Sequence, residues 1–182
     1  MNFKFLSVLF LLFLSMSMTS DQKIIILGNV MIDLNLLEED QPILMILKNG
    51  DQIVKQTKIE KDLTFNLSNS SNCNCDLYYK EFGGKEVYIQ LIKTEKSDTL
   101  KISFSLPKEY HKDDGKVNCP KCNLKDQTIE IAYGIKSIVI YDKNPPNYIT
   151  YDGYGKEEIY DGGCGSSPFA AQYFCKRDRI KF

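Results

Sequence analysis

The sequence predicts a mainly β protein, with an N-terminal antiparallel β-sandwich followed by a small cysteine-stabilised β module. Short apolar runs alternate with polar residues through the first half of the chain, as half-buried strands do. Clusters of Gly, Asn, Ser and Asp separate these runs at the spacing of a small sandwich. Four of the six cysteines fall after residue 118, which indicates that sulfur holds the second half together.

The composition excludes several classes of protein. The chain has 182 residues, 43% of them apolar, which is enough for a sizeable core and too apolar for a disordered protein. Its 23 basic and 24 acidic side chains nearly cancel, so we expect no nucleic-acid partner. The single histidine, His111, argues against the commonest general base. Since no recognisable motif pairs carboxylates either, we expect no enzyme.

Residues 1–20 have the layout of a secretory signal peptide. Lys4 precedes an apolar run over 5–13, and small polar residues follow it at the expected cleavage site. The apolar run is shorter than the roughly 20 residues that span a bilayer. We therefore expect a secreted or periplasmic protein that has no membrane partner after cleavage.

The predicted sandwich covers residues 21–107. Asn49-Gly50 is a strong hairpin signal, and residues 68–84 are predicted to form a loop because Asn, Ser and Gly are enriched there. Cys73 and Cys75 in this loop are candidates for one strained disulfide, two longer ones or a soft-metal site. The predicted strands, in chain order, are 23–30, 43–47, 53–59, 63–67, 87–91 and 100–106.

The order of landmarks in this half, Gly28, Pro42, Gly50, Thr57 and Phe65, resembles the transthyretin-like sandwich of carboxypeptidase regulatory-like domains. The chain departs from that pattern at 60–62, where such domains place a glycine-containing turn. The resemblance implies adhesion or scaffolding, with a protein or glycan as the partner.

Residues 108–117 are predicted to link the sandwich to a second module over 118–182. That module opens with Cys119-Pro-Lys-Cys122, a spacing that forms a tight knuckle with two sulfurs pointing at one centre. A β-rich stretch follows over 127–133, and Cys164 and Cys175 come later.

The order of motifs in the second half resembles that of small bacterial zinc-ribbon-like proteins. The matching pieces are CPKC at 119–122, IEIAYG at 129–134, GGC at 162–164, YFC at 173–175 and the terminal Phe182. The chain departs from the pattern where the closing Cys-x-x-Cys has become Cys175-x-x-Asp178. The resemblance implies a zinc site with one thiolate fewer.

Three outcomes stay open for these cysteines. Zinc can bind Cys119, Cys122, Cys175 and either Cys164 or Asp178, because a carboxylate is an acceptable ligand. The same cysteines can instead form disulfides in an oxidising compartment. A redox-active Cys-x-x-Cys would need a helix after the first thiol, which Pro120 disfavours.

These observations favour an exported, non-enzymatic binding or structural protein. The alternative is a metal-handling protein whose Cys-x-Cys and Cys-x-x-Cys pairs bind zinc or copper(I) as its function.

Overall fold

The computed structural model confirms the mainly β class. It describes residues 24–33, 35, 42–69, 74–93, 99–134, 149–151, 158–164 and 167–182, and these contain strands, turns and no α-helix. The predicted signal peptide and Cys73 lie outside the described residues. None of the described segments is a helix long and apolar enough to cross a membrane.

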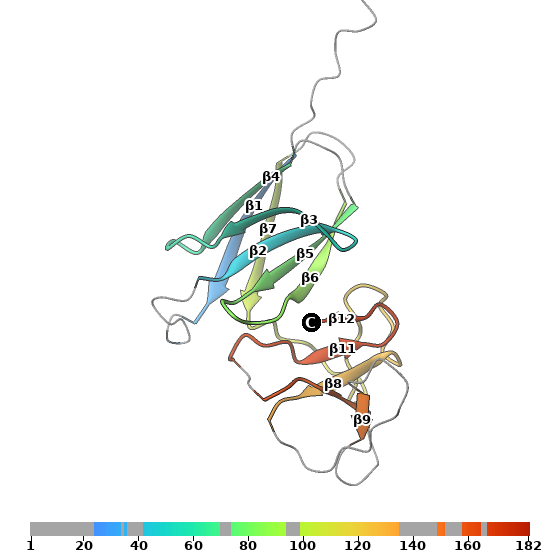
Figure 1. The fold of residues 1–182 in the computed structure, drawn as a ribbon. Helices are drawn as coiled ribbons and strands as arrows, with labels where there is room; N and C mark the ends of the chain where they lie inside the picture. The colour runs from blue at the N-terminus through green and yellow to red at the C-terminus, as the bar shows by residue number, and fades with distance from the viewer. Residues whose placement is uncertain are drawn as a thin grey trace, which may run out of the picture.

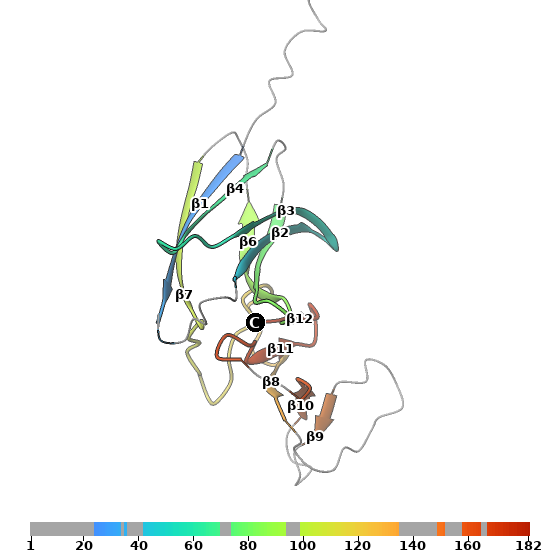
Figure 2. The same ribbon diagram turned by 60° about the vertical axis from the view of Figure 1, so that its left-hand side comes forward.

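The N-terminal half forms two facing sheets (Figures 1 and 2). The order of the first sheet is β4-β1-β7 and that of the second is β3-β2-β5-β6. The strands of the first sheet are β1 (Ile24–Ile32), β4 (Thr64–Asn69) and β7 (Thr99–Leu106). Those of the second sheet are β2 (Leu44–Asn49), β3 (Gln52–Lys58), β5 (Asn74–Lys80) and β6 (Val87–Lys93). The Asn49-Gly50 hairpin joins β2 to β3 as predicted, with Gly50 at a φ of +59°.

The core lies between the two sheets, where inward side chains alternate with exposed ones along β1. Ile26, Leu47, Phe65 and Leu77 are nearly inaccessible members of this core. Every strand pair in the sandwich is antiparallel except β1 with β7, so the first sheet is mixed.

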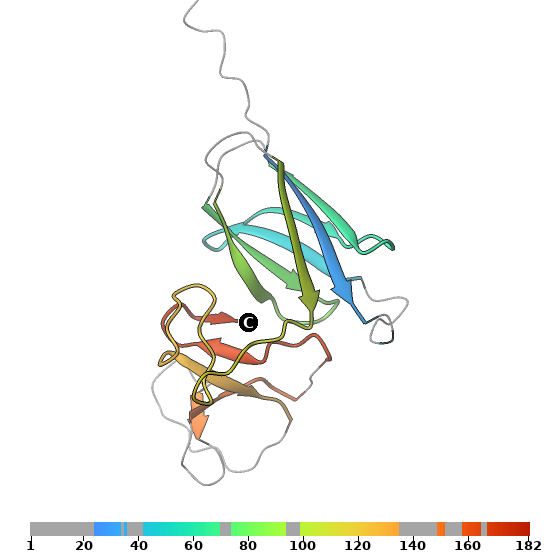
Figure 3. The ribbon, with the colours of Figure 1, turned by 180° about the vertical axis from the view of Figure 1, so that it is seen from behind.

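A third sheet, made of shorter strands, follows, with the strand order β12-β11-β8-β10-β9. Its strands are β8 (Thr128–Ala132), β9 (Ile149–Tyr151), β10 (Glu158–Asp161), β11 (Tyr173–Cys175) and β12 (Ile180–Lys181). It lies at one end of the sandwich, and the C-terminus lies at the junction (Figures 1 and 3).

The two halves share buried surface. Phe169 and Ala171 from the second half join the core of the sandwich, and the Tyr79 hydroxyl donates to the Phe169 carbonyl oxygen at 2.7 Å. The predicted linker also packs. Tyr110 forms edge-on ring contacts with Tyr173 and Phe182, at centroid distances of 5.7 and 5.2 Å. Segment 108–117 therefore joins the halves through packed contacts and is not a free tether.

The prediction of a loop over 68–84 is wrong, because β5 occupies 74–80 in the middle of the second sheet. The Asn- and Ser-rich residues that precede the strand favour a loop, so the strand that follows them was predicted as part of that loop. Cys75, Leu77 and Tyr79 face the core, while Asp76 is also buried on the opposite face. A strand covered on both faces lacks the alternation that reveals a half-buried one.

The predicted alternation of Val87, Ile89 and Leu91 also fails within β6. A register shift opposite Leu77 and Tyr78 inserts one extra residue, as a β-bulge does. Beyond the bulge, odd-numbered side chains point away from the core and even-numbered ones point into it, so Leu91 is exposed while Ile92 is buried.

Gly28 in β1 is required by close packing. A Cβ built at this position would overlap the Phe65 ring, which belongs to the core. We expect Gly28→Ala to lower the free energy of unfolding by about 1–3 kcal/mol, as overpacking does, measured by urea denaturation. Gly84→Ala is the control, since its Cβ would meet the nearest atom at an ordinary 3.4 Å. Equal stability of the two variants would contradict the packing argument.

Candidate metal centre

Two turns of the same geometry bring the candidate ligands together. The first runs from Cys119 to Asn123 in the connection between β7 and β8, and the second runs from Cys175 to Arg179 between β11 and β12. In each turn the N–H of the fifth residue donates to the carbonyl oxygen of the first at 2.8 Å. The fifth residue is left-handed in both, with φ of +60° at Asn123 and +55° at Arg179.

Hydrogen bonds to sulfur complete this knuckle geometry. The Asp178 N–H donates to the Cys175 sulfur at 3.5 Å. The backbone N–H groups of Lys121 and Cys122 act on the Cys119 sulfur in the same direction, since they oppose the rise of its pKa. Such bonds favour the thiolate form, which is the form that binds a metal ion. Both turns therefore aim one residue's sulfur and the side chain three positions later at a common point.

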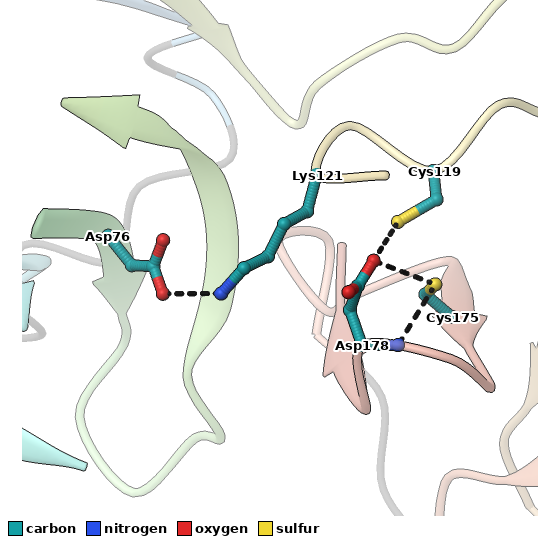
Figure 4. A network of polar contacts seen from close by, with 5 residues as sticks. All are labelled: Asp76, Cys119, Lys121, Cys175 and Asp178. Carbon is teal, nitrogen blue, oxygen red and sulfur yellow. Dashed lines mark hydrogen bonds and ion pairs between the residues drawn. The ribbon is translucent and has the colours of Figure 1, made fainter. Parts of the chain in front are cut away.

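Four side chains converge there: Cys119, Cys122, Cys175 and Asp178. Their ligand atoms all lie within 4.8 Å of one another. The Asp178 Oδ2 lies 3.6 Å from the sulfurs of both Cys119 and Cys175 (Figure 4). The sulfurs of Cys122 and Cys175 lie 3.7 Å apart. This group of three thiols and one carboxylate can hold a metal ion.

The spacing fits a tetrahedral ion. With Zn–S distances of about 2.3 Å and a Zn–O distance of about 2.0 Å, the ligand sulfurs would lie about 3.8 Å apart and the sulfur and oxygen about 3.5 Å apart. Three of the six distances between ligand atoms match these values, at 3.7 Å between the Cys122 and Cys175 sulfurs and 3.6 Å from the Asp178 oxygen to the Cys119 and Cys175 sulfurs. The other three are at most 4.8 Å. A disulfide needs about 2.05 Å between its sulfurs, and Cys119, Cys122, Cys164 and Cys175 are all free thiols.

Burial shapes the protonation of the group. Cys119 and Cys175 are fully buried, and burial raises the pKa of both thiols despite the N–H donors around them. Burial also opposes ionisation of Asp178, but hydrogen bonds from the three thiols outweigh it and lower the pKa of this carboxyl. Cys122 and Asp178 are half-buried, so solvent reaches the group from their side.

The first knuckle is tied to the sandwich. Lys121, between the two cysteines, pairs with Asp76 of β5 at 2.7 Å (Figure 4). Tyr88 of β6 is fully buried in the apolar cluster that contains Cys119 and Cys175. Sequence reasoning missed both contacts. The one signal in the sequence was a charged residue inside the apolar run 75–79, which indicates a buried partner without naming it.

Cys164 does not belong to the group. It is an exposed thiol beyond β10 that lines a separate hollow. Of the two fourth ligands that the sequence left open, Asp178 is therefore the one that the structure brings to Cys119, Cys122 and Cys175. The residues after Cys122 form turns that lead into β8, which is not the helical setting of a thioredoxin-type motif.

Comparison with known proteins finds no matching family model, no matching curated protein and no matching solved structure. Fold and site therefore define this chain as a mainly β protein with a Cys₃Asp cluster able to hold a metal ion. The resemblances to regulatory-like sandwiches and zinc ribbons stay predictions.

Arg179 stores strain in the second knuckle, because a residue with a Cβ disfavours its φ of +55°. We expect Arg179→Gly to raise the free energy of unfolding of the metal-free protein by up to about 1 kcal/mol. Arg177→Gly is the matched control, since Arg177 is exposed in the same turn and has no positive φ. If Arg177→Gly raised the free energy of unfolding as much as Arg179→Gly, the left-handed backbone of Arg179 would not be the source of the gain.

Proposed function

We propose that Cys119, Cys122, Cys175 and Asp178 bind one zinc ion, and that this ion has a structural role in an exported, non-enzymatic binding or structural protein. The observation that carries the proposal is the convergence of four ligand atoms within 4.8 Å of one another, with three of their six distances matching the edges of a zinc tetrahedron. The signal-like layout of residues 1–20 supports export.

The chemistry of the donors favours zinc over copper(I). Copper(I) prefers soft thiolate and thioether ligands, whereas zinc accepts a carboxylate oxygen beside thiolate sulfurs. Asp178 contributes a hard oxygen, and its knuckle places that oxygen where a fourth sulfur would otherwise lie. All four positions come from the protein, which is typical of a structural site and not of a catalytic one.

The position of the group supports a structural role. The ligands come from two turns separated by more than fifty residues, and two of them are part of the apolar cluster between the halves. The strands that flank the second knuckle, β11 and β12, have three and two residues. Such short strands bury little surface, so a metal ion would supply much of the energy that orders them.

The competing function, metal handling, is favoured by the partial exposure of Cys122 and Asp178. A transfer protein needs such an open side, because an acceptor must reach the ion to displace its ligands. A structural ion would exchange slowly and its loss would unfold the tail, whereas a transferred ion would exchange quickly and leave the fold unchanged.

Changing the fourth ligand tests which atoms bind. We expect Asp178→Cys to tighten zinc binding, and Asp178→Asn to weaken it, each by about tenfold or more, equivalent to about 1.4 kcal/mol. Competition with a chromophoric chelator measures both changes. In the cobalt(II) form, Asp178→Cys should strengthen the sulfur-to-metal charge-transfer band. Asp126→Asn is the charge-matched control, since Asp126 is exposed. An unchanged zinc affinity in Asp178→Asn would exclude Asp178 as a ligand.

Removing the metal tests its role. We expect the purified mature protein to contain one zinc ion per chain and to lose thermal stability on chelation. An ion at a thousand times its dissociation constant adds about 4 kcal/mol. Cys122→Ser should show the lower melting temperature without any chelator. A zinc-free protein whose melting temperature does not respond to added zinc would refute the site, and fast zinc exchange with no loss of stability would favour metal handling.

A further inference from the structure

A second site lies at the junction of the two halves, away from the thiol group. A hollow of about 280 Å³ opens between the β5–β6 connection and the C-terminal sheet. Lys85 and Lys181 line it from opposite halves of the chain, together with the exposed thiol of Cys164. This volume is at the lower end of the range for small-molecule sites, so its occupant would have few atoms.

The two lysines line the hollow together, and among the described residues neither is paired with an acidic side chain. Burial together with the charge of Lys85 lowers the pKa of Lys181 to about 8. Within the described part of the chain, neither lysine forms an ion pair. The Lys85 Nζ reaches only the Gly162 carbonyl oxygen, at 3.5 Å, and the Lys181 Nζ lies over the Tyr160 ring at 4.8 Å.

Apart from the Cys164 thiol, the other side-chain donors that line the hollow are already bonded. The Glu81 carboxylate accepts a hydrogen bond from the Ser167 hydroxyl. The hydroxyls of Tyr79 and Tyr133 donate to the carbonyl oxygens of Phe169 and Ala171, each at 2.7 Å. The two ammonium groups are thus the charged donors left for a ligand, and adjacent like charges are stabilised by an anion between them.

We propose that this hollow binds a small oxyanion, the carboxylate or phosphate group of a low-molecular-weight ligand, between the ammonium groups of Lys85 and Lys181. The site is assembled from both halves and is independent of the metal ligands. A single oxyanion presents two or more oxygens, which lets each lysine donate a charge-assisted hydrogen bond. Glu81 leaves the hollow with a net positive charge of one, which favours one anionic group over several.

Titration of the full mature chain tests the proposal, with inorganic phosphate and acetate as probes at constant ionic strength, followed by amide chemical shifts. We expect saturable binding of at least one probe, and at least tenfold weaker binding in Lys85→Gln and in Lys181→Gln. Lys55→Gln is the charge-matched control, since Lys55 is exposed on β3. Binding of neither probe, or equal weakening in all three variants, would overturn the proposal.

Alkylation of Cys164 gives a second readout that needs no bound ligand. Iodoacetate is anionic and iodoacetamide is neutral, so the ratio of their rates reports the local attraction for anions, independently of thiol ionisation. We expect this ratio at Cys164, followed by peptide mass spectrometry, to fall at least threefold in both lysine variants and to be unchanged in Lys55→Gln. An identical ratio in all these proteins would contradict an anion-attracting hollow. Unchanged melting temperatures would show that the variants are folded.

Discussion

The constraint on which the C-terminal half depends is the convergence of two turns on one point. Strands of two to five residues cannot bury a core of their own, and this sheet instead closes against β6 through an apolar cluster. Cys119 and Cys175 are members of that cluster and also the first residues of the two knuckles. The same few residues thus form the candidate metal site and the junction between the halves, so that a metal ion bound there would also hold the tail against the sandwich.

The ion pair between Asp76 and Lys121 extends this coupling into the sandwich. Asp76 lies near the centre of β5 with only 7% of its surface exposed, and the lysine that the knuckle supplies is its ion-pair partner. A buried carboxylate without its partner costs several kcal/mol. The knuckle also needs β5, because the pair holds Lys121 away from the thiols and fixes the turn's orientation. A loss of order in either half would therefore destabilise the other, even though each has its own sheet.

The sequence predicts those parts of the structure that follow from local pattern. Alternation located β4 and β7, a β-branched apolar run located β1, and Asn49-Gly50 located the β2–β3 hairpin. Spacing located Cys119 and Cys122, because a Cys-x-x-Cys knuckle is a local structure, and the resemblance to zinc ribbons added Cys175. The sequence could not decide whether Cys164 or Asp178 is the fourth ligand. That choice depends on the left-handed backbone of Arg179, which no residue propensity favours. β5 was missed because tertiary contacts cover its second face, and the hollow was missed because its two lysines are far apart in the chain.

The hairpin of β11 and β12 connects the two proposed sites physically. Cys175 pairs with Ile180 on the face that joins the apolar cluster, and Phe174 pairs with Lys181 on the opposite face, where both contact Tyr160. Since side chains alternate along a strand, the register of a two-residue strand decides which face Lys181 occupies. The turn of residues 176–179 sets that register, and the same turn carries Asp178 to the thiols. A metal ion that fixes this turn would therefore also hold Lys181 beside Lys85, although the two sites share no ligand.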